Sequence, residues 1–169
     1  FVQDDYDWDT RKAIVASDEG MSRDNWQLFA ELGWLSIPFA EEHGGFGGNI
    51  VDLSVVMEEL GKGLVVEPYF ATVVLFGGLI KRVGSESQQA EWLPRIIGGE
   101  VLGAFAYVER QSRFALNDCQ TTATKSGEGY VLNGEKVVVF NGEQADNLVV
   151  MARTSGDQSD SDGLSLFIV

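Results

Sequence analysis

Apolar positions recur with helical spacing over the first hundred residues of this sequence and with strand spacing after them. The clearest helical stripe consists of Trp26, Phe29 and Leu32, at positions i, i+3 and i+6. Ser22 precedes this stripe and can cap a helix, and Gly33 follows it as a terminator. We therefore predict a helix between Ser22 and Gly33.

Two further helices are predicted in the first half of the chain. One runs from about residue 51 to residue 60, with Val55, Val56 and Leu60 directed inward. The other covers residues 68–83 and is apolar nearly all round, and its first residue is a proline, which suits a first helical turn. Such a pattern predicts a mostly buried helix.

A last helix is indicated by the capping box Ser85-Glu86-Ser87-Gln88. It continues through Trp92 and Leu93 and stops at Gly98. Pro94 lies inside it, and an interior proline removes a hydrogen bond and crowds the preceding turn. We therefore expect a kink or an early end at Pro94.

After Glu100 the pattern changes to short runs rich in β-branched residues. The pair Asn133-Gly134 is the strongest two-residue signal for a type I′ hairpin. We predict an antiparallel β-meander in which residues 155–162 form a polar surface loop. Its strands are expected within residues 121–125, 130–132, 136–140, 148–152 and 164–169.

Helices followed by strands define the α+β class. We predict an N-terminal all-α helical domain at residues 1–100, with a trimmed start, and a β-domain at residues 101–169 that is incomplete at its C-terminal end. The last predicted strand stops at Val169 and leaves an open edge. We therefore expect the natural protein to continue.

Charge and cysteine content narrow the function classes. Asp and Glu number 26 against 12 Lys and Arg, which gives a formal net charge of −14. A surface this acidic repels a phosphate backbone, so we predict no nucleic-acid partner. No stretch approaches the ~20 apolar residues of a membrane span, so none is predicted. The single cysteine, Cys119, excludes an intrachain disulfide and favours a cytoplasmic protein.

The glycine-rich segment His43–Gly48 has two interpretations. It could hold a phosphate, but it lacks the P-loop pattern and no clear strand precedes it, so a tight turn with positive φ is favoured. His43 is the only histidine and has no Ser or Cys partner in view. The acidic run at residues 4–9 lacks the EF-hand glycine, so we predict no metal site.

Two stretches taken together resemble the acyl-CoA dehydrogenase family. The first is FAELGWLSIPFAEEHGGFGG at residues 29–48, followed by VVMEELGKG at residues 55–63. The second is TTATKSGEGYVLNGEKVVVFNGEQADNLVVMART at residues 121–154. Their order matches the family's helical domain followed by its β-domain. The phrase FAYVERQ at residues 105–111 is similar to the small subunit of pimeloyl-CoA dehydrogenase-type enzymes, in which two related chains assemble.

The resemblance implies a subunit of three parts: helices, an antiparallel β-barrel of which the first part is present here, and a C-terminal four-helix bundle that this chain lacks. It implies FAD as cofactor, an acyl-CoA substrate, an electron-transfer flavoprotein or similar acceptor, and a homo- or hetero-oligomer with a related subunit. The reaction implied is α,β-dehydrogenation of an acyl-CoA thioester in fatty-acid or dicarboxylic-acid breakdown. The family's catalytic base is usually a glutamate of the missing bundle, so we assign no catalytic residue and expect this fragment alone to be inactive.

The resemblance also places the cofactor-binding positions, which are Phe105, Tyr107, Val108, Val138 and Phe140. The family's Thr-Glu-Pro phrase aligns with Val108, Glu109 and Arg110, so its hydroxyl and its proline are missing here. Its Trp-x-Thr phrase aligns so that Val138 and Phe140 replace the aromatic ring and the hydroxyl. Backbone contacts from Tyr107 and Val108 do not depend on the side chains, so we expect them to persist.

Arg110, Arg113 and Phe114 are the substrate-binding residues that the resemblance implies, because they align with the family's flavin-facing loop. Two cations there could hold a CoA phosphate, the flavin pyrophosphate or a substrate carboxylate. The alternative is that both arginines pair with surface acids of this acidic chain.

Several functions therefore stay open. The first is a subunit of a flavin-dependent acyl-CoA dehydrogenase. The others are a heteromeric partner with a degenerate flavin site, a flavin monooxygenase or acyl-CoA oxidase of the same fold, and a non-catalytic structural subunit.

Overall fold

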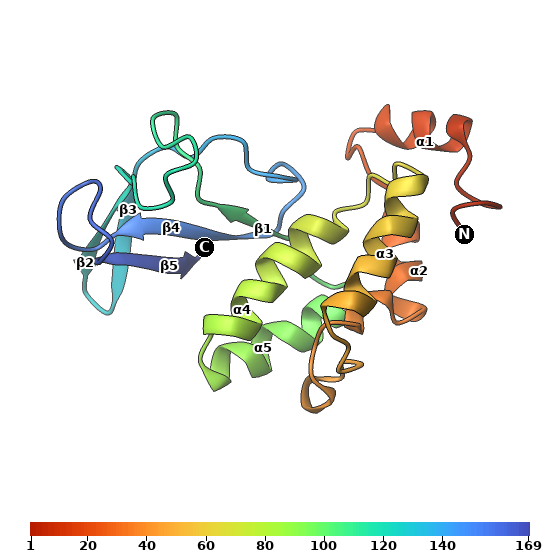
Figure 1. The fold of residues 1–169 in the computed structure, drawn as a ribbon, viewed down its shortest axis with the longest axis horizontal. Helices are drawn as coiled ribbons and strands as arrows, with labels where there is room; N and C mark the ends of the chain where they lie inside the picture. The colour runs from red at the N-terminus through yellow and green to blue at the C-terminus, as the bar shows by residue number, and fades with distance from the viewer. The chain divides into compact units, whose positions relative to one another are not determined.

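The computed structural model describes all 169 residues and divides into two compact units, residues 1–102 and residues 103–169. The first unit is helical and the second contains the sheet (Figure 1). The α+β class is thereby confirmed. No helix is long and apolar enough to cross a membrane.

The first unit has five α-helices and three shorter or wider helical segments. The α-helices are α1 (Trp8–Val15), α2 (Arg23–Glu31), α3 (Ile50–Lys62), α4 (Gly78–Val83) and α5 (Glu86–Ile97). Two 3₁₀ turns, η1 (Trp34–Ser36) and η2 (Glu41–His43), connect α2 to α3. A π-helix, η3 (Phe70–Gly77), runs directly into α4.

Capping signals in the sequence are confirmed where they were predicted. The Ser22 side chain accepts a hydrogen bond from the Asn25 N–H at 3.2 Å and so begins α2. Ser85 and Gln88 form the capping box of α5. Each cap satisfies N–H groups that have no partner within the helix, which fixes where the helix starts.

Two expectations about these helices need correction. The helix α5 does not end early at Pro94 but continues to Ile97, because Leu93 and Ile96 are fully buried and hold its last turn against the first unit's core. In α3 the inward stripe is Leu53, Val56 and Leu60, while Val55 is 56% exposed. The apolar residues of α3 exceed those that one face can bury, so the sequence alone did not select the face.

The glycine-rich segment His43–Gly48 forms the tight turn that the sequence favoured. Gly44 and Gly47 have φ of 86° and 70°, in the left-handed region. At Gly45 a Cβ would collide with the backbone carbonyl of Phe39, so the chain must approach itself closely there.

The core of the first unit combines aromatic and aliphatic side chains and contains one buried carboxylate. Its largest fully buried side chains are Trp26, Tyr69, Phe29, Phe39, Phe76, Leu35, Leu93, Ile96, Leu102, Val73 and Val101. Glu67 is 5% exposed and accepts hydrogen bonds from the Tyr6 hydroxyl (3.1 Å), the Asn25 amide (2.9 Å) and the Ser22 N–H (3.4 Å). These donors replace the water that the carboxylate loses on burial.

We expect Tyr6→Phe to lower the free energy of unfolding of the helical unit by about 1–2 kcal/mol, because the hydroxyl links Glu67 to the Val66 N–H in a buried position. Burial also raises the pKa of Tyr6 to about 12, so the phenol is protonated and can donate at any ordinary pH. All four tryptophans lie in the helical unit, so urea unfolding followed by tryptophan fluorescence measures it directly. Tyr130→Phe, on a 49% exposed ring of the other unit, is the control and should leave that curve unchanged.

The second unit is a mixed five-stranded sheet, built from β1 (Gly103–Ala106), β2 (Thr122–Ser126), β3 (Gly129–Asn133), β4 (Asn147–Arg153) and β5 (Leu164–Ile168). The strand β4 is central: it pairs in parallel with β1, in antiparallel with β5, and in parallel with β2 at the single pair Thr122–Arg153. The expected antiparallel meander is therefore wrong for the pairing of β4 with β1 and β2, whereas the β4–β5 pair is antiparallel as expected. The long excursion between β1 and β4 lets β4 return beside β1 in the same direction.

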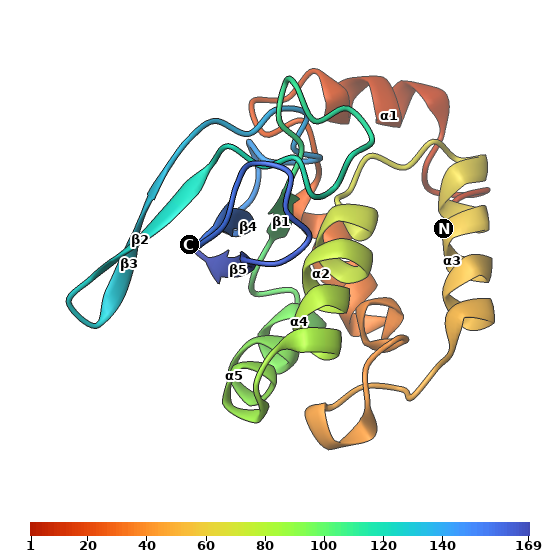
Figure 2. The same cartoon turned by 60° about the vertical axis from the view of Figure 1, so that its left-hand side comes forward.

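The hairpin is also displaced from its predicted turn. The strands β2 and β3 pair in antiparallel and are joined at Gly127-Glu128, where Gly127 has φ of 60°. They form a ribbon that projects from the rest of the sheet (Figure 2). Residues 136–140 form no strand, so Asn133-Gly134 is not a hairpin turn. Gly134 is required for another reason: a Cβ there would lie 2.6 Å from the Thr121 Cα.

Candidate functional site

The predicted flavin-facing residues lie on two neighbouring segments of the sheet unit. Phe105 is on β1, and Tyr107 and Val108 follow directly after it. The rings of Phe105 and Tyr107 stack with centroids 4.7 Å apart. Val138 and Phe140 lie in the connection between β3 and β4 and are 70% and 51% exposed.

One backbone hydrogen bond joins these two segments. The Val137 N–H donates to the Val108 carbonyl at 2.9 Å, which places Val138 next to the end of β1. Val138 has φ of 53°, a left-handed conformation that is unfavourable for a β-branched residue. Strain of this kind persists only where the surrounding structure holds the backbone in place.

The predicted substrate-binding residues are exposed. The Arg110 guanidinium lies 2.8 Å from Glu135, an ion pair whose side chains are 79% and 67% exposed. Both residues line an open cavity of about 380 Å³ at the base of the β2–β3 ribbon. Arg113 adopts φ of 46°, and Phe114 is 98% exposed. Arg110 is thus paired with a surface acid, as the alternative interpretation expected. The side chain of Phe114 has no packing role within this chain.

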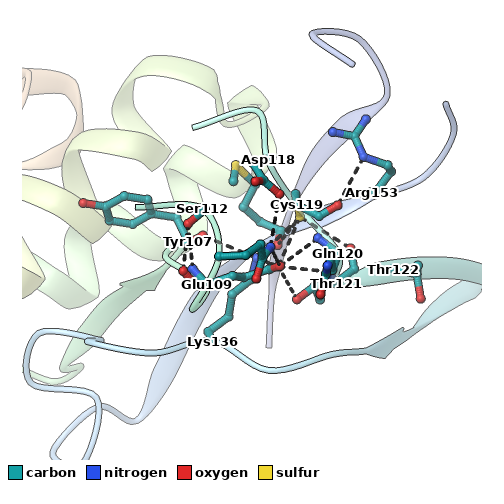
Figure 3. Close-up of polar contacts among 12 residues, drawn as sticks. Tyr107, Glu109, Ser112, Asp118, Cys119, Gln120, Thr121, Thr122, Lys136 and Arg153 are labelled. Atoms are coloured by element: carbon teal, nitrogen blue, oxygen red, sulfur yellow. Dashed lines mark hydrogen bonds and ion pairs between the residues drawn. The ribbon is translucent and has the colours of Figure 1, made fainter. Parts of the chain in front are cut away.

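Glu109 is the centre of the polar contacts in this unit (Figure 3). Its side chain is 3% exposed, and its carboxylate accepts hydrogen bonds from several directions. The donors are Lys136 Nζ at 2.7 Å, the Thr121 hydroxyl at 2.6 Å, the Thr121 N–H at 2.9 Å, the Gln120 N–H at 2.7 Å and Gln111 Nε2 at 2.7 Å. Every lone pair that burial removes from water is thereby matched by a donor.

Lys136 neutralises this carboxylate from the opposite segment. Its side chain is 7% exposed, and its ammonium group also lies 3.5 Å from the Tyr107 carbonyl and 3.5 Å from Cys119 Sγ. Burial alone would raise the pKa of Glu109, but the hydrogen bonds from Lys136, Thr121 and their neighbours outweigh it and hold that pKa far below its ordinary value. Burial raises the pKa of the Cys119 thiol, so the cysteine stays protonated and is a poor nucleophile.

We expect the stability of the sheet unit to fall with pH in a way that depends on Glu109. A carboxylate whose pKa is lowered by folding adds stability above its unfolded pKa of about 4.3, and this stability is lost as the pH falls below that value. Hydrogen exchange of the β4 amides, compared between pH 6 and pH 3, measures this loss. In Glu109→Gln the decline should be shallower, and an identical decline in both proteins would contradict the assignment.

Arg153 holds a second buried polar centre at the end of β4. Its side chain is 6% exposed, and it donates only to backbone carbonyls, without an acidic partner. The nearest acceptors are the carbonyls of Asn117 (2.8 Å), Asp162 (2.9 Å), Gln158 (3.0 Å) and Asp160 (3.1 Å). The guanidinium therefore ties the loop after β4 to the segment before β2.

Sequence patterns did not predict the buried polar contacts around Glu109 and Arg153. The sequence places Glu109 only as an aligned position and Lys136 at the start of a predicted strand, while Arg153 falls just beyond the predicted strand at residues 148–152. The available signal was a charged residue inside or beside an otherwise apolar run, since such a residue is buried only when it is paired.

Comparison with known proteins identifies the family. Residues 4–100 match the N-terminal domain of acyl-CoA dehydrogenases, and residues 104–169 match the middle domain of the same family. The chain therefore belongs to the acyl-CoA dehydrogenase family.

Individual relatives agree with this assignment. The mitochondrial long-chain specific acyl-CoA dehydrogenase of Sus scrofa is 34% identical over 153 residues, which are 88% of this chain and 35% of that protein. Among solved structures, the Tcur3481-Tcur3483 steroid ACAD G363A variant has a TM-score of 0.86 at 27% identity and covers 99% of this chain and 44% of its own. The ChsE4-ChsE5 complex of Mycobacterium tuberculosis has a TM-score of 0.80 at 26% identity, covering 95% and 41%. The chain thus spans less than half the length of each relative.

Acyl-CoA dehydrogenases depend on FAD, so FAD is the cofactor that membership of the family implies. The residues present fit a flavin through the main chain. Neither the Val108 N–H nor the Val138 N–H donates a hydrogen bond within the chain, so both can meet an external acceptor. The apolar side chains of Val108, Val138 and Phe140 offer contact surface to a ring but no hydrogen-bond donor.

Proposed function

We propose that this chain is the helical and middle portion of a subunit of a flavin-dependent acyl-CoA dehydrogenase. The assembly is an oxidoreductase that acts on an acyl-CoA thioester in fatty-acid or dicarboxylic-acid breakdown in the cytoplasm. Two family domains in register along the chain support the general activity. The chain contributes a flavin-facing frame, while the catalytic base belongs to the C-terminal part of the family's fold.

The proposed reaction removes two hydrogens and forms a carbon–carbon double bond. A carboxylate outside this chain would take the α-proton. The chemistry that FAD would supply when bound is acceptance of the β-hydrogen as a hydride, with the electrons passed on to an electron-transfer flavoprotein or a similar acceptor. In this chain the Val108 and Val138 N–H groups hold acceptor atoms of the cofactor. The exposed apolar side chains of Val138 and Phe140 offer contact surface to its ring.

We further propose that this chain acts as the smaller partner of a two-chain enzyme of the pimeloyl-CoA dehydrogenase type. The observation that carries this is the loss of every side-chain donor at Val108, Val138 and Phe140. A flavin held only through the backbone of this chain needs further donors from a related subunit. Two of the relatives described above are named as pairs of proteins, Tcur3481-Tcur3483 and ChsE4-ChsE5.

The visible spectrum of the full-length protein tests this proposal. Produced alone, it should carry little flavin, and produced together with its related subunit it should give an assembly with a flavin band. A stoichiometric flavin band in the protein alone would overturn the partner role and leave an independent flavoprotein. An assembly without flavin would overturn the flavin-dependent function.

We assign Arg110 and Arg113 to an anionic group of the acyl-CoA substrate, because both are exposed cations beside the flavin-facing segments. The double variant Arg110→Ala/Arg113→Ala should lower the affinity of the assembly for acyl-CoA about tenfold, the effect of losing roughly 1.4 kcal/mol of binding free energy. Calorimetric titration with an acyl-CoA measures this affinity. An unchanged value would remove the assignment.

An acyl-CoA oxidase or flavin monooxygenase is the second candidate, since both share this fold. The observation that favours it is the 70% exposure of Val138 in this chain, because a flavin reached by solvent can also be reached by oxygen. Oxygen consumption by the assembly without an added electron acceptor would favour these reactions. Turnover only with an acceptor would favour the dehydrogenase.

A further inference from the structure

We infer that Glu109 is a positioning residue for the flavin: together with Lys136, its carboxylate holds the Val108 and Val138 N–H groups in the orientation that binds the cofactor. This inference rests on the proposed function, because it concerns the same flavin-facing frame. It assigns the role to a side chain that itself does not reach the cofactor.

The first step concerns what the carboxylate connects. Glu109 directly follows Val108, and its side chain turns inward to accept from Thr121 and Gln120, which lead into β2. Its own N–H and carbonyl both bond to the Ser112 hydroxyl at 3.0 Å, which closes the turn that follows. The backbone at Val108 is therefore fixed on the side that leads away from β1.

The second step concerns the opposite segment. Lys136 precedes Val138 by two residues, and its ammonium lies 2.7 Å from Glu109 and 3.5 Å from the Tyr107 carbonyl. Figure 3 shows the Lys136 side chain reaching across to Glu109, while the Tyr107 ring points away from the pair. The Val137 N–H also donates a hydrogen bond to the Val108 carbonyl. Together with this bond, the Glu109–Lys136 pair connects the two segments on both sides of the flavin-facing positions.

The third step concerns strain. Val138 is held at φ of 53°, although an extended conformation is easier for valine. This orientation must be maintained by its neighbours, and the buried contact of Lys136 is the strongest one nearby. Without it, Val138 would relax and its N–H would turn, so the flavin would lose a donor at a position where no side chain can replace it.

The same two segments carry a matched ion pair that serves as a control. Arg110 directly follows Glu109, and Glu135 directly precedes Lys136. The side chains of Arg110 and Glu135 are nevertheless 79% and 67% exposed. An exposed pair is screened by water and contributes little. If any ion pair between these segments were enough to position the flavin, both pairs would affect FAD binding equally. If burial of the pair is required, only Glu109 and Lys136 will affect it.

The test uses the full-length protein assembled with its related subunit. Glu109→Gln keeps the shape of the side chain and removes its charge. FAD is removed and added back to measure its dissociation constant, and the absorbance band and midpoint potential of the bound flavin are recorded. We expect the constant to rise about tenfold or more, with a shifted band and potential, while Glu135→Gln leaves all three unchanged.

A variant that fails to fold is recognised by far-ultraviolet circular dichroism, and a second substitution then decides. Thr121→Val removes the 2.6 Å hydrogen bond to Glu109 but keeps its charge and its partner Lys136. It should move the flavin band and the dissociation constant in the same direction by a smaller amount. No movement in Thr121→Val, or in a folded Glu109→Gln, would overturn the positioning role.

These outcomes are distinct from failure of the proposed function. If the unchanged assembly binds no FAD, the flavin-dependent function fails, whatever Glu109 does. If it binds FAD and both variants bind it equally well with the same band and potential, the flavin function stands and Glu109 is only a structural residue. Equal losses in Glu109→Gln and Glu135→Gln would also contradict the inference, because the exposed pair would then be as important as the buried one.

Discussion

Lys136→Met is expected to lower the free energy of unfolding of residues 103–169 by about 3–5 kcal/mol, because it leaves the Glu109 carboxylate buried without a cation. Glu109 and Lys136 are 3% and 7% exposed, so neither can turn to water without opening the unit. The remaining donors to Glu109 compensate only in part, since none carries a charge. The loss should therefore far exceed that of an exposed pair.

Hydrogen exchange of the β4 and β5 amides measures this effect. Tryptophan fluorescence does not, because all the tryptophans lie in the helical unit. Lys125→Met, on the exposed ribbon, is the matched control and should change little. Combining Lys136→Met with Glu109→Gln should restore part of the lost protection, since the stranded charge is then gone. Equal exchange in Lys136→Met and Lys125→Met would show that the buried pair does not stabilise the unit.

Arg153→Met is expected to lower the free energy of unfolding of the same unit by about 2–4 kcal/mol. The substitution retains a long apolar side chain, so the packing at the end of β4 is largely kept. What disappears is the guanidinium that serves the carbonyls of Asn117, Gln158, Asp160 and Asp162. Water can reach some of these acceptors when the loop opens, which limits the loss.

The same exchange experiment separates a local from a global effect of this substitution. Amides of residues 154–163 should lose protection first, and those of β4 and β5 should follow by a smaller amount. Arg113→Met, an exposed arginine of the same unit, is the control. Unchanged protection in the loop would contradict the anchoring role of Arg153.

Helix starts were predictable because their signals are local. Ser22 and Ser85 act on N–H groups three residues away, so the sequence contains the whole interaction. The face of α3 and the passage of α5 through Pro94 were not predictable, because packing against distant residues decides both. The α+β class followed from periodicity, and the family likeness added the expectation of a β-barrel and a C-terminal helix bundle.

In the sheet unit, too, local signals and long-range packing differ in what they make predictable. Asn133-Gly134 has the local chemistry of a hairpin turn, but Gly134 is needed for its close approach to Thr121 and the true turn is at Gly127. The candidate site was predicted as a set of surface positions. Its organising pair, Glu109 and Lys136, is separated by 27 residues, and nothing in either neighbourhood indicates the other. Long-range pairing of buried charges is settled by three-dimensional packing.

The proposed flavin-facing positions illustrate how a site can keep its backbone geometry while its side chains change. Val108 and Val138 present backbone N–H groups, which any residue except proline supplies. Substitution at these positions therefore removes the side-chain donors and leaves the main-chain donors in place. What must be retained is whatever fixes the backbone, and in this structure that is the buried pair beside it.

Arg153 has a consequence for how the loop after β4 can vary. Its guanidinium is bound by carbonyl oxygens, which every amino acid carries, and the loop side chains from Ser155 to Asp162 are exposed. The composition of this loop is thus free to drift among related proteins, whereas its length is not, because one inserted residue would carry a carbonyl out of reach. Gly156 and Gly163, with φ of 76° and 84°, are the loop residues whose identity should be fixed, and at Gly163 a Cβ would also collide with the Ser155 carbonyl. A library randomised from Ser155 to Asp162 with Gly156 kept should therefore yield mostly folded proteins, and a library of insertions at the same place should not.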